Sequence, residues 1–355
     1  MSALFTPLAL RAVTLPNRIA LAPMCQYSAG PDGLPTDWHR VHLGARAVGG
    51  AGLVLTEATA VVPEGRISPQ DTGLWSGAHV DAWRPVTSFV AAQGAVPAVQ
   101  LAHAGFKAST YRPWAGRRGG VPDAEGGWTP VGPGAEPFVP DYRVPAALDE
   151  AGIAAVVEAF AGAAARALDA GFAAVEIHAA HGYLLHEFLS PLTNQRGDGW
   201  GGDRADRMRL TLEVARAVRA AVGERVPVLT RISATDWTEG GWTVDDSVVL
   251  AGELAAAGVD LVDASSGGAS ATATIPVGPG YQVPLAARIR REAGVATGAV
   301  GLIVEPEQAE QIVADGEADL VLLGRELLRD PYWPRRAATR LGAAPSWPPQ
   351  YARAF

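Results

Sequence analysis

The sequence predicts an α/β protein, a single-domain (β/α)₈ TIM barrel over residues 1–355. Eight short apolar runs are rich in Leu or β-branched residues, which is typical of parallel strands covered on both faces. Amphipathic stretches separate most of these runs, and the length suits one large barrel with insertions. The expected strands lie at 18–23, 52–59, 96–103, 173–180, 226–233, 259–266, 295–300 and 318–324.

Helices are expected between the strands, and capping residues support their ends. The clearest examples are 149–171, 203–223, 243–258 and 304–316. Residues suited to the starts are Asp149, Asp203 and either Thr243 or Asp245, and residues suited to the ends are Gly171, Gly223, Gly258 and Gly316.

The segment 104–148 follows the third expected strand and is rich in Gly, Pro and Trp. It is too long for a plain connection, so we expect a lid or cap over the barrel mouth. A doubly wound sheet is the alternative fold, and it would place G-x-G-x-x-G after the first strand. The sequence there is APMCQYSAG, which does not match.

The composition excludes several classes of protein. Hydrophobic residues make up 48% and charged residues 19% of the chain, which is unlike a disordered protein. The formal charge of −8 argues against nucleic acid or an anionic membrane as the partner. The single cysteine permits no internal disulfide, and no run approaches the roughly 20 uninterrupted apolar residues of a membrane span. We expect a cytoplasmic protein.

Polar residues gather where the expected strands end, which is the face of a barrel that carries the active site. They are mostly uncharged hydrogen-bonding groups, which suit a flat organic ligand with polar edges. The set includes Tyr27, Gln100, His178, His181, Tyr183 and Arg231.

Three histidines in this set raise the alternative of a metal site. His186 is expected on the helix after the fourth strand, where it points away from His178 and His181. No Asp or His at the other strand ends offers an evident further ligand, so we expect no metal. Histidines that only pack the core are the other alternative.

The last two strands carry the residues of a possible phosphate site. Barrels often bind phosphate there through backbone N–H groups and a helix N-terminus. Gly301 and Gly324 permit a close approach of the backbone, and Arg325 adds a charged fork.

Long motifs resemble the Old Yellow Enzyme family of FMN-dependent ene-reductases. The fourth-strand motif EIHAAHGYLLHEFLSPLTNQRGDGWGG is the most specific of them. The cysteine of PMCQY resembles the thermophilic-like or xenobiotic-reductase subclass. The other matching segments, in order along nearly the whole chain, are LPNRIALAPMCQYSA, EATAVVPEGRIS, VQLAHAG, RISATDW and LLGRELLRDPYWP.

The resemblance implies a role for each site residue. His178 and His181 donate hydrogen bonds to a substrate carbonyl, Tyr27 assists, and Tyr183 delivers a proton. The residues implied to contact the FMN ring are Pro23, Met24, Cys25, Ala58, Gln100 and Arg231, and those implied to hold its phosphate are Gly301, Gly324 and Arg325.

Two further features are the C-terminal tail and one departure from the family motifs. The resemblance implies a homodimer or homotetramer in which Arg353, in the tail 341–355, reaches the active site of a neighbouring subunit. A frayed terminus is the alternative. The segment HAGFKAS departs from the related HAGRKAS, because Phe106 stands where an arginine is common.

The function implied is NADPH- or NADH-dependent reduction of the C=C bond of activated alkenes, such as enones or nitroalkenes, through FMN. Three alternatives remain: another flavin barrel of the dihydroorotate dehydrogenase kind, a metal-dependent hydrolase, and a non-catalytic barrel or redox sensor that uses Cys25.

Overall fold

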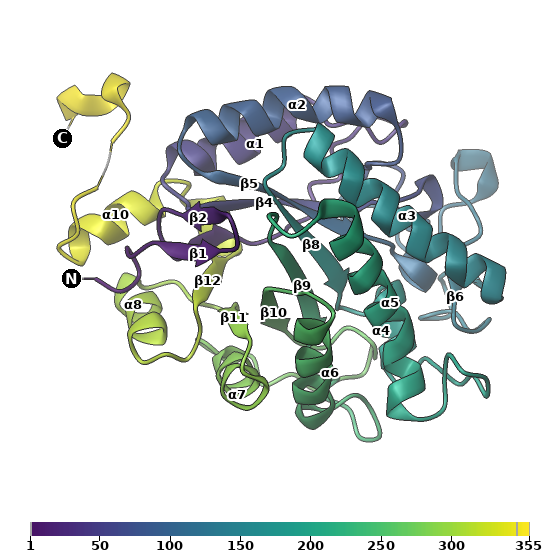
Figure 1. Ribbon diagram of the computed structural model, residues 1–355. Helices are drawn as coiled ribbons and strands as arrows, with labels where there is room; N and C mark the ends of the chain where they lie inside the picture. The colour runs from purple at the N-terminus through teal and green to yellow at the C-terminus, as the bar shows by residue number, and fades with distance from the viewer. Residues whose placement is uncertain (1, 346, 355) are drawn as a thin grey trace.

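The structure is a computed structural model that describes residues 2–345 and 347–354 (Figure 1). Its centre is a closed barrel of eight parallel strands, which confirms the predicted fold. Each strand lies within an expected range apart from β4, which runs one residue further. The barrel strands are β3 (Ile19–Leu21), β4 (Leu53–Ala60), β5 (Val96–Ala102), β8 (Ala174–Ala179), β9 (Val228–Ser233), β10 (Leu261–Ser265), β11 (Ala296–Ala299) and β12 (Leu320–Leu323).

Helices surround the barrel (Figure 1). Asp149, Asp203 and Thr243 accept hydrogen bonds at helix starts as predicted, and Thr243, not Asp245, is the cap of its helix. Glycine stands at or directly after each of the four expected helix ends. The helices are α1 (Asp37–Val48), α2 (Gly77–Ala92), α3 (Glu150–Asp169), α4 (Leu184–Leu189), α5 (Arg204–Val222), α6 (Val244–Ala256), α7 (Val283–Ala293), α8 (Pro306–Ala314), α9 (Arg325–Arg329) and α10 (Trp333–Arg340).

The interior of the barrel has an apolar layer below a polar one. Side chains alternate between the two faces of a strand, so residues two apart point into the same space. The lower layer is apolar, as Leu229 and Leu261 show. Two residues further along the same strands come Arg231 and Asp263, both buried. The polar layer therefore lies towards the C-terminal ends of the strands.

A hairpin that the sequence did not predict closes the bottom of the barrel. Strands β1 (Leu8–Leu10) and β2 (Val13–Leu15) pair antiparallel. Leu8, Leu10 and Leu15 pack with the apolar layer of the interior. Because the N-terminal ends of the strands are covered in this way, the open end of the barrel is the one with the polar layer.

The segment 104–148 contains little regular structure. It holds two short strands, β6 (Val131–Gly132) and β7 (Ala146–Ala147), and the 3₁₀ turns η2 (Gly105–Lys107) and η3 (Asp123–Glu125). Arg66, just after η1 (Pro63–Gly65), lies over the rings of both Trp75 and Trp128. This contact ties the segment to the connection after β4.

Helix α3 is long and apolar enough to cross a membrane by length and composition alone. Its buried face, which includes Ile153, Phe160 and Ala167, packs into the main hydrophobic core. That packing is the ordinary role of a barrel helix, whose apolar stripe faces the sheet.

Candidate active site

Two histidines and a tyrosine meet at the exit of β8. His178 is the second-last residue of β8 and is buried, and Tyr183 is the N-cap of α4. The Nε2 atom of His178 lies 3.4 Å from Nδ1 of His181. The ring centroids of His178 and His181 are 5.1 Å apart, and those of His178 and Tyr183 are 5.0 Å apart. The structure therefore brings together the three residues that the motif singled out.

A turn through the left-handed region folds the chain back at this point. His181 and Gly182 have φ angles of 61° and 70°. A Cβ on Gly182 would stand 2.2 Å from the carbonyl oxygen of Gly268, so only glycine fits there. The backbone N–H of His181 donates to Ser233 Oγ at 2.9 Å, which holds the turn against β9.

Hydrogen bonds orient both imidazoles. The backbone N–H of Ala180 donates to His178 Nδ1 at 3.3 Å, so in the neutral ring the proton is on Nε2, the atom that faces His181. On the other ring, His181 Nε2 lies 2.7 Å from Ser265 Oγ. Ser265 is a site residue that the sequence analysis missed. The signal in the sequence that could have identified Ser265 was its position at the end of an expected strand, where barrels place their site residues.

The surroundings keep all three side chains neutral. Desolvation, followed by the positive charge of Arg231, holds the pKa values of His178 and His181 well below the usual range. Desolvation likewise raises the pKa of Tyr183 well above its ordinary value. At neutral pH the site therefore offers two uncharged imidazoles and an undissociated phenol.

Cys25 and Tyr27 lie close to this group. Tyr27 lies within electrostatic reach of both Cys25 and Tyr183, and Tyr183 lies within reach of Cys25. Burial raises the pKa of the Cys25 thiol and of the Tyr27 phenol, so both remain protonated at neutral pH. The ring of Trp114 packs edge-on against Tyr27, with centroids 5.5 Å apart.

A buried carboxylate holds the backbone directly after Cys25. Glu57 Oε2 accepts the backbone N–H of Gln26 at 2.6 Å, and Glu57 Oε1 lies 2.8 Å from His39 Nε2. Both side chains are almost completely buried. The segment is thus fixed from behind by α1 and β4.

Beneath the histidines, four buried polar residues span neighbouring strands. Gln100 Nε2 donates to Glu176 Oε1 at 2.8 Å, and Arg231 Nε lies 3.1 Å from Asp263 Oδ2. Desolvation raises the pKa of both Glu176 and Asp263, while the charge of Arg231 opposes the rise. The sequence analysis named Gln100 and Arg231 but missed the two carboxylates, which face inward two residues before His178 and Ser265.

A cavity of about 180 Å³ opens between the ends of β11 and β12. It brings together Gly301, Gly324 and Arg325, the three residues expected to hold a phosphate, and its lining also includes Arg231 and Ser265. The other lining residues are Tyr281, Gln282, Val300, Leu302, Ile303, Val304, Leu322, Glu326 and Arg329.

Glycine is required at the rim of this cavity. Gly301 has a φ of 126°, and a Cβ there would stand 2.9 Å from the ring of Tyr281. At Gly324 a Cβ would lie 3.5 Å from the sulfur of Met24, which places Met24 beside the cavity.

The structure says less about the other residues expected at the FMN ring. Ala58 and Gln100 are paired in register on β4 and β5. For Pro23, the structure shows only that it directly precedes Met24 at the end of β3.

His186 is structural. Its Nδ1 accepts the backbone N–H of Gly182 at 2.8 Å, and its Nε2 lies 3.0 Å from Asp236 Oδ1. Both nitrogens are thus engaged, and the side chains of His186 and Asp236 are fully buried. The pair supports the turn that carries His181.

Lys107 is a further residue that the sequence analysis missed. Its ammonium donates to the carbonyl oxygens of His181 at 2.8 Å and Gly268 at 2.6 Å. Burial lowers the pKa of Lys107 to about 8. The lysine therefore links the turn that carries His181 to the loop after β10. Its position next to Phe106 in HAGFKAS was the only signal in the sequence.

Arg353 lies in η4 (Pro349–Ala354), away from the histidines of its own chain. It is exposed and lines a hollow beside α10 together with Tyr332, Trp347 and Tyr351. Two residues of the expected tail 341–355, Ser346 and Phe355, lie outside the described residues.

Comparisons with known proteins identify the family of the chain. Residues 3–343 match the profile of the NADH:flavin oxidoreductase / NADH oxidase family. An NADPH dehydrogenase of Geobacillus sp. (strain WCH70) is 47% identical over 353 residues, which cover 99% of this chain and 98% of that protein.

Two solved structures have the same architecture. Morphinone reductase in complex with tetrahydroNAD is 31% identical, with a TM-score of 0.77 over 98% of this chain and 93% of that one. The old yellow enzyme homologue from Zymomonas mobilis is 29% identical, with a TM-score of 0.79 over 98% of this chain and 97% of that one.

The residues present fit FMN. Arg325 is a cation at a cavity whose rim at Gly301 excludes a side chain, which is what a phosphate group requires. Gln100 and Arg231 supply an amide and a positive charge deeper in the barrel. The chain belongs to the NADH:flavin oxidoreductase / NADH oxidase family, as an FMN-dependent oxidoreductase of the NADPH dehydrogenase type.

Proposed function

We propose that the enzyme reduces the C=C bond of activated alkenes, namely α,β-unsaturated carbonyl compounds and nitroalkenes. The observation that carries this proposal is the meeting of two neutral imidazoles and a neutral phenol above a barrel that fits FMN. When bound, FMN supplies a hydride that it has received from NADPH or NADH.

His178 and His181 bind and polarise the carbonyl oxygen. Negative charge develops on this oxygen as the β-carbon is reduced, and a pair of donors aimed at it stabilises the transition state more than the ground state. His178 Nε2 and His181 Nδ1 face each other at 3.4 Å, so one oxygen that displaces this contact can accept from both rings. Tyr27 assists at the same oxygen.

Tyr183 delivers the proton to the α-carbon. The raised pKa of its phenol means that the proton is present throughout the neutral range. A general acid placed in this way typically contributes about 10²- to 10⁴-fold to the rate. The edge-on packing of His178 against Tyr183 keeps the acid next to the group that holds the substrate.

The remaining predicted residues bind the cofactor. Arg231 would supply a positive charge and Gln100 an amide to the bound FMN ring, and Gly301, Gly324 and Arg325 would hold its phosphate. Pro23, Met24, Cys25 and Ala58 line the ring, with Cys25 adjusting its potential. The support is that Arg231 and the three phosphate residues line a common cavity with Met24 beside it.

The enzyme forms a homodimer or homotetramer in the cytoplasm, and Arg353 completes the active site of a neighbouring subunit. Two observations support this arrangement. Arg353 is exposed at the edge of the chain, and its neighbour Tyr351 contacts Tyr332 with ring centroids 6.2 Å apart. The tail is thus placed by aromatic packing and its arginine stays free to reach outward.

Half-reactions test the proposal. The purified protein is expected to be yellow, to bleach with NADPH without oxygen, and to regain its colour when cyclohexenone is added. Tyr183→Phe should slow the recolouring step about 10²-fold or more while sparing the bleaching. If cyclohexenone restores no colour, the alkene reductase proposal is wrong. If the variant slows both steps or neither, Tyr183 is not the acid.

A further inference from the structure

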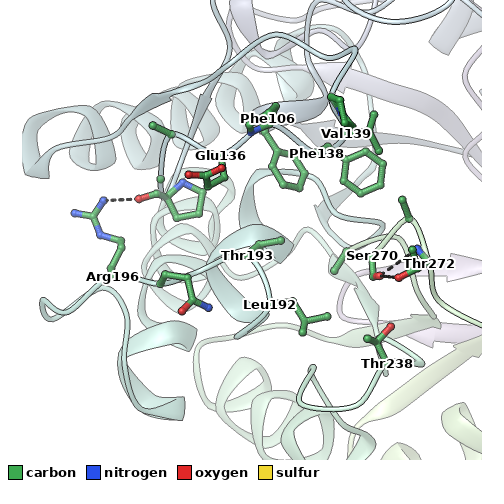
Figure 2. Close-up of a pocket in the computed structure, with 18 residues that line it drawn as sticks. Phe106, Glu136, Phe138, Val139, Leu192, Thr193, Arg196, Thr238, Ser270 and Thr272 are labelled. Carbon is green, nitrogen blue, oxygen red and sulfur yellow. Dashed lines mark hydrogen bonds between the residues drawn. The ribbon is translucent and has the colours of Figure 1, made fainter.

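A groove of about 740 Å³ lies outside the predicted machinery (Figure 2). Phe106 and Phe138 of the 104–148 segment form one side, Leu192 and Thr193 face them, and Ser270 and Thr272 of the loop after β10 form the end. A volume of this size accommodates a drug-sized molecule, since such sites measure roughly 300–1,000 Å³.

The polar groups in the walls of the groove are already satisfied within the protein. Arg196 is bound by Asp198 and by the carbonyl oxygens of Pro133 and Leu148. The hydroxyl of Thr193 donates to the carbonyl of Glu187, and Ser270 and Thr272 bond to each other. The surface left for an occupant is therefore mainly hydrocarbon.

Charge also narrows the choice of occupant. Glu136 is the other charged lining residue, and it is exposed on the rim. With Arg196 neutralised by Asp198, the described lining presents no unpaired cation for a phosphate. The dinucleotide part of NADPH is consequently a poor fit, and a neutral apolar group is a good one.

Lys107 lies between the groove and the turn that carries His181. The ammonium of Lys107 lies 3.9 Å from the centroid of Phe138 and 5.8 Å from that of Tyr183, so it contacts the groove wall and adjoins the proposed acid. The same ammonium binds Gly268, and the next residue, Ala269, begins the far wall.

Phe106 gives the wall its aromatic character. Its side chain is buried and packs on Phe138, with ring centroids 5.3 Å apart. Its backbone N–H is held by Glu187 Oε1 at 2.9 Å, which fixes the start of the segment on α4. A long cationic side chain at this position would bring a charge to the same wall.

We propose that this groove binds the distal apolar part of the alkene substrate, so that the enzyme favours enones bearing an aryl or similarly bulky hydrocarbon group. The inference rests on the proposed function, because the reactive end of such a substrate lies at His178, His181 and Tyr183. Its far end extends past Lys107 and lies against Phe138.

Blocking the groove from its exposed loop tests the proposal. Ala271 lines the groove and is exposed, so Ala271→Trp fills the space without disturbing the core. Thr274→Trp is the matched control, because Thr274 is exposed in the same loop but does not line the groove. The measurement is kcat/KM for 4-phenyl-3-buten-2-one and for cyclohexenone in the FMN-loaded enzyme.

Ala271→Trp should lower the ratio of the two kcat/KM values, aryl enone over cyclohexenone, about tenfold or more. Thr274→Trp should leave it within about twofold of the parent. An unchanged ratio in Ala271→Trp, or an equal fall in the control, overturns the groove proposal. If neither enone is reduced, the proposed function has failed instead.

Binding of the saturated ketone 4-phenylbutan-2-one, followed by calorimetry, decides about the groove even in that case. The parent should bind it, and Ala271→Trp should weaken the affinity about tenfold relative to Thr274→Trp. Equal affinities in the two variants overturn the proposal whether or not the enzyme reduces alkenes.

Discussion

Removal of the Ser265 hydroxyl should impair the binding of the substrate oxygen. Ser265 Oγ lies 2.7 Å from His181 Nε2 and is the described partner of that nitrogen. In the Ser265→Ala variant this nitrogen of the half-buried imidazole is left without that partner. Such a loss costs about 1–3 kcal/mol, which corresponds to roughly 5- to 150-fold in rate or affinity.

The adjacent serine provides a matched control. Ser266 Oγ donates to Gln282 Oε1 at 2.5 Å, whereas the same oxygen is 3.5 Å from Ser265. Ser266→Ala therefore disturbs Gln282 without touching His181. We expect kcat/KM for cyclohexenone to fall about tenfold in Ser265→Ala and to change much less in Ser266→Ala.

Stopped-flow measurement of recolouring after NADPH reduction is the assay, because it isolates the step in which the alkene is bound. A nitrogen NMR signal of His181 that moves in Ser265→Ala but not in Ser266→Ala would show the change at the ring itself. The reasoning is refuted if both variants lose activity equally, or if Ser265→Ala keeps the parent rate constant.

Three further outcomes are expected. Gly301→Ala should weaken FMN binding, measured by release of the cofactor. A Cβ there would stand 2.9 Å from the Tyr281 ring, and the φ of 126° is strained for alanine. Gly278→Ala is the control and should not weaken binding, because nothing lies within 4 Å of a Cβ at that position. Burial lowers the pKa of His103 to about 4, so the unfolded chain binds an extra proton below its ordinary pKa of about 6.5. The free energy of unfolding should fall as pH falls from about 6.5 to 4, and His103→Gln should flatten that dependence in urea titrations. Deletion of 351–355 should raise the KM for cyclohexenone, and an unchanged KM would remove the role of Arg353.

Many elements of the fold could be predicted because their signals are local. A buried parallel strand needs a continuous apolar run, and a helix needs a cap, so β8 and the start of α3 at Asp149 are legible in a few consecutive residues. The hairpin β1–β2 escaped prediction, since three-residue strands carry too little pattern. The fold of 104–148 escaped because the segment has little regular structure. Irregular turns inside it hold most of its backbone, and a few bonds, such as that from the N–H of Thr110 to the carbonyl of Ile67, tie it to the rest of the chain.

The same distinction holds for the site. His178, His181 and Tyr183 could be singled out because one short stretch, the end of β8 and the turn after it, carries all three. Gly301 and Arg325 could be singled out because each stands after a strand end. The motif could not show which groups surround those residues. Ser265 and Lys107 come from other parts of the chain, 84 and 74 residues from His181.

The sequence by itself determined the order of strands and helices, the stretch that carries His178, His181 and Tyr183, and the class of cofactor. Only the tertiary structure decided how the inward faces of the strands align. The register of β8, β9 and β10 sets Arg231 beside both His178 and Asp263, and the charge of Arg231 helps to keep the histidines neutral. The physical reason is that alternation along a strand is local, whereas the neighbour across the barrel is chosen by closure of the whole sheet.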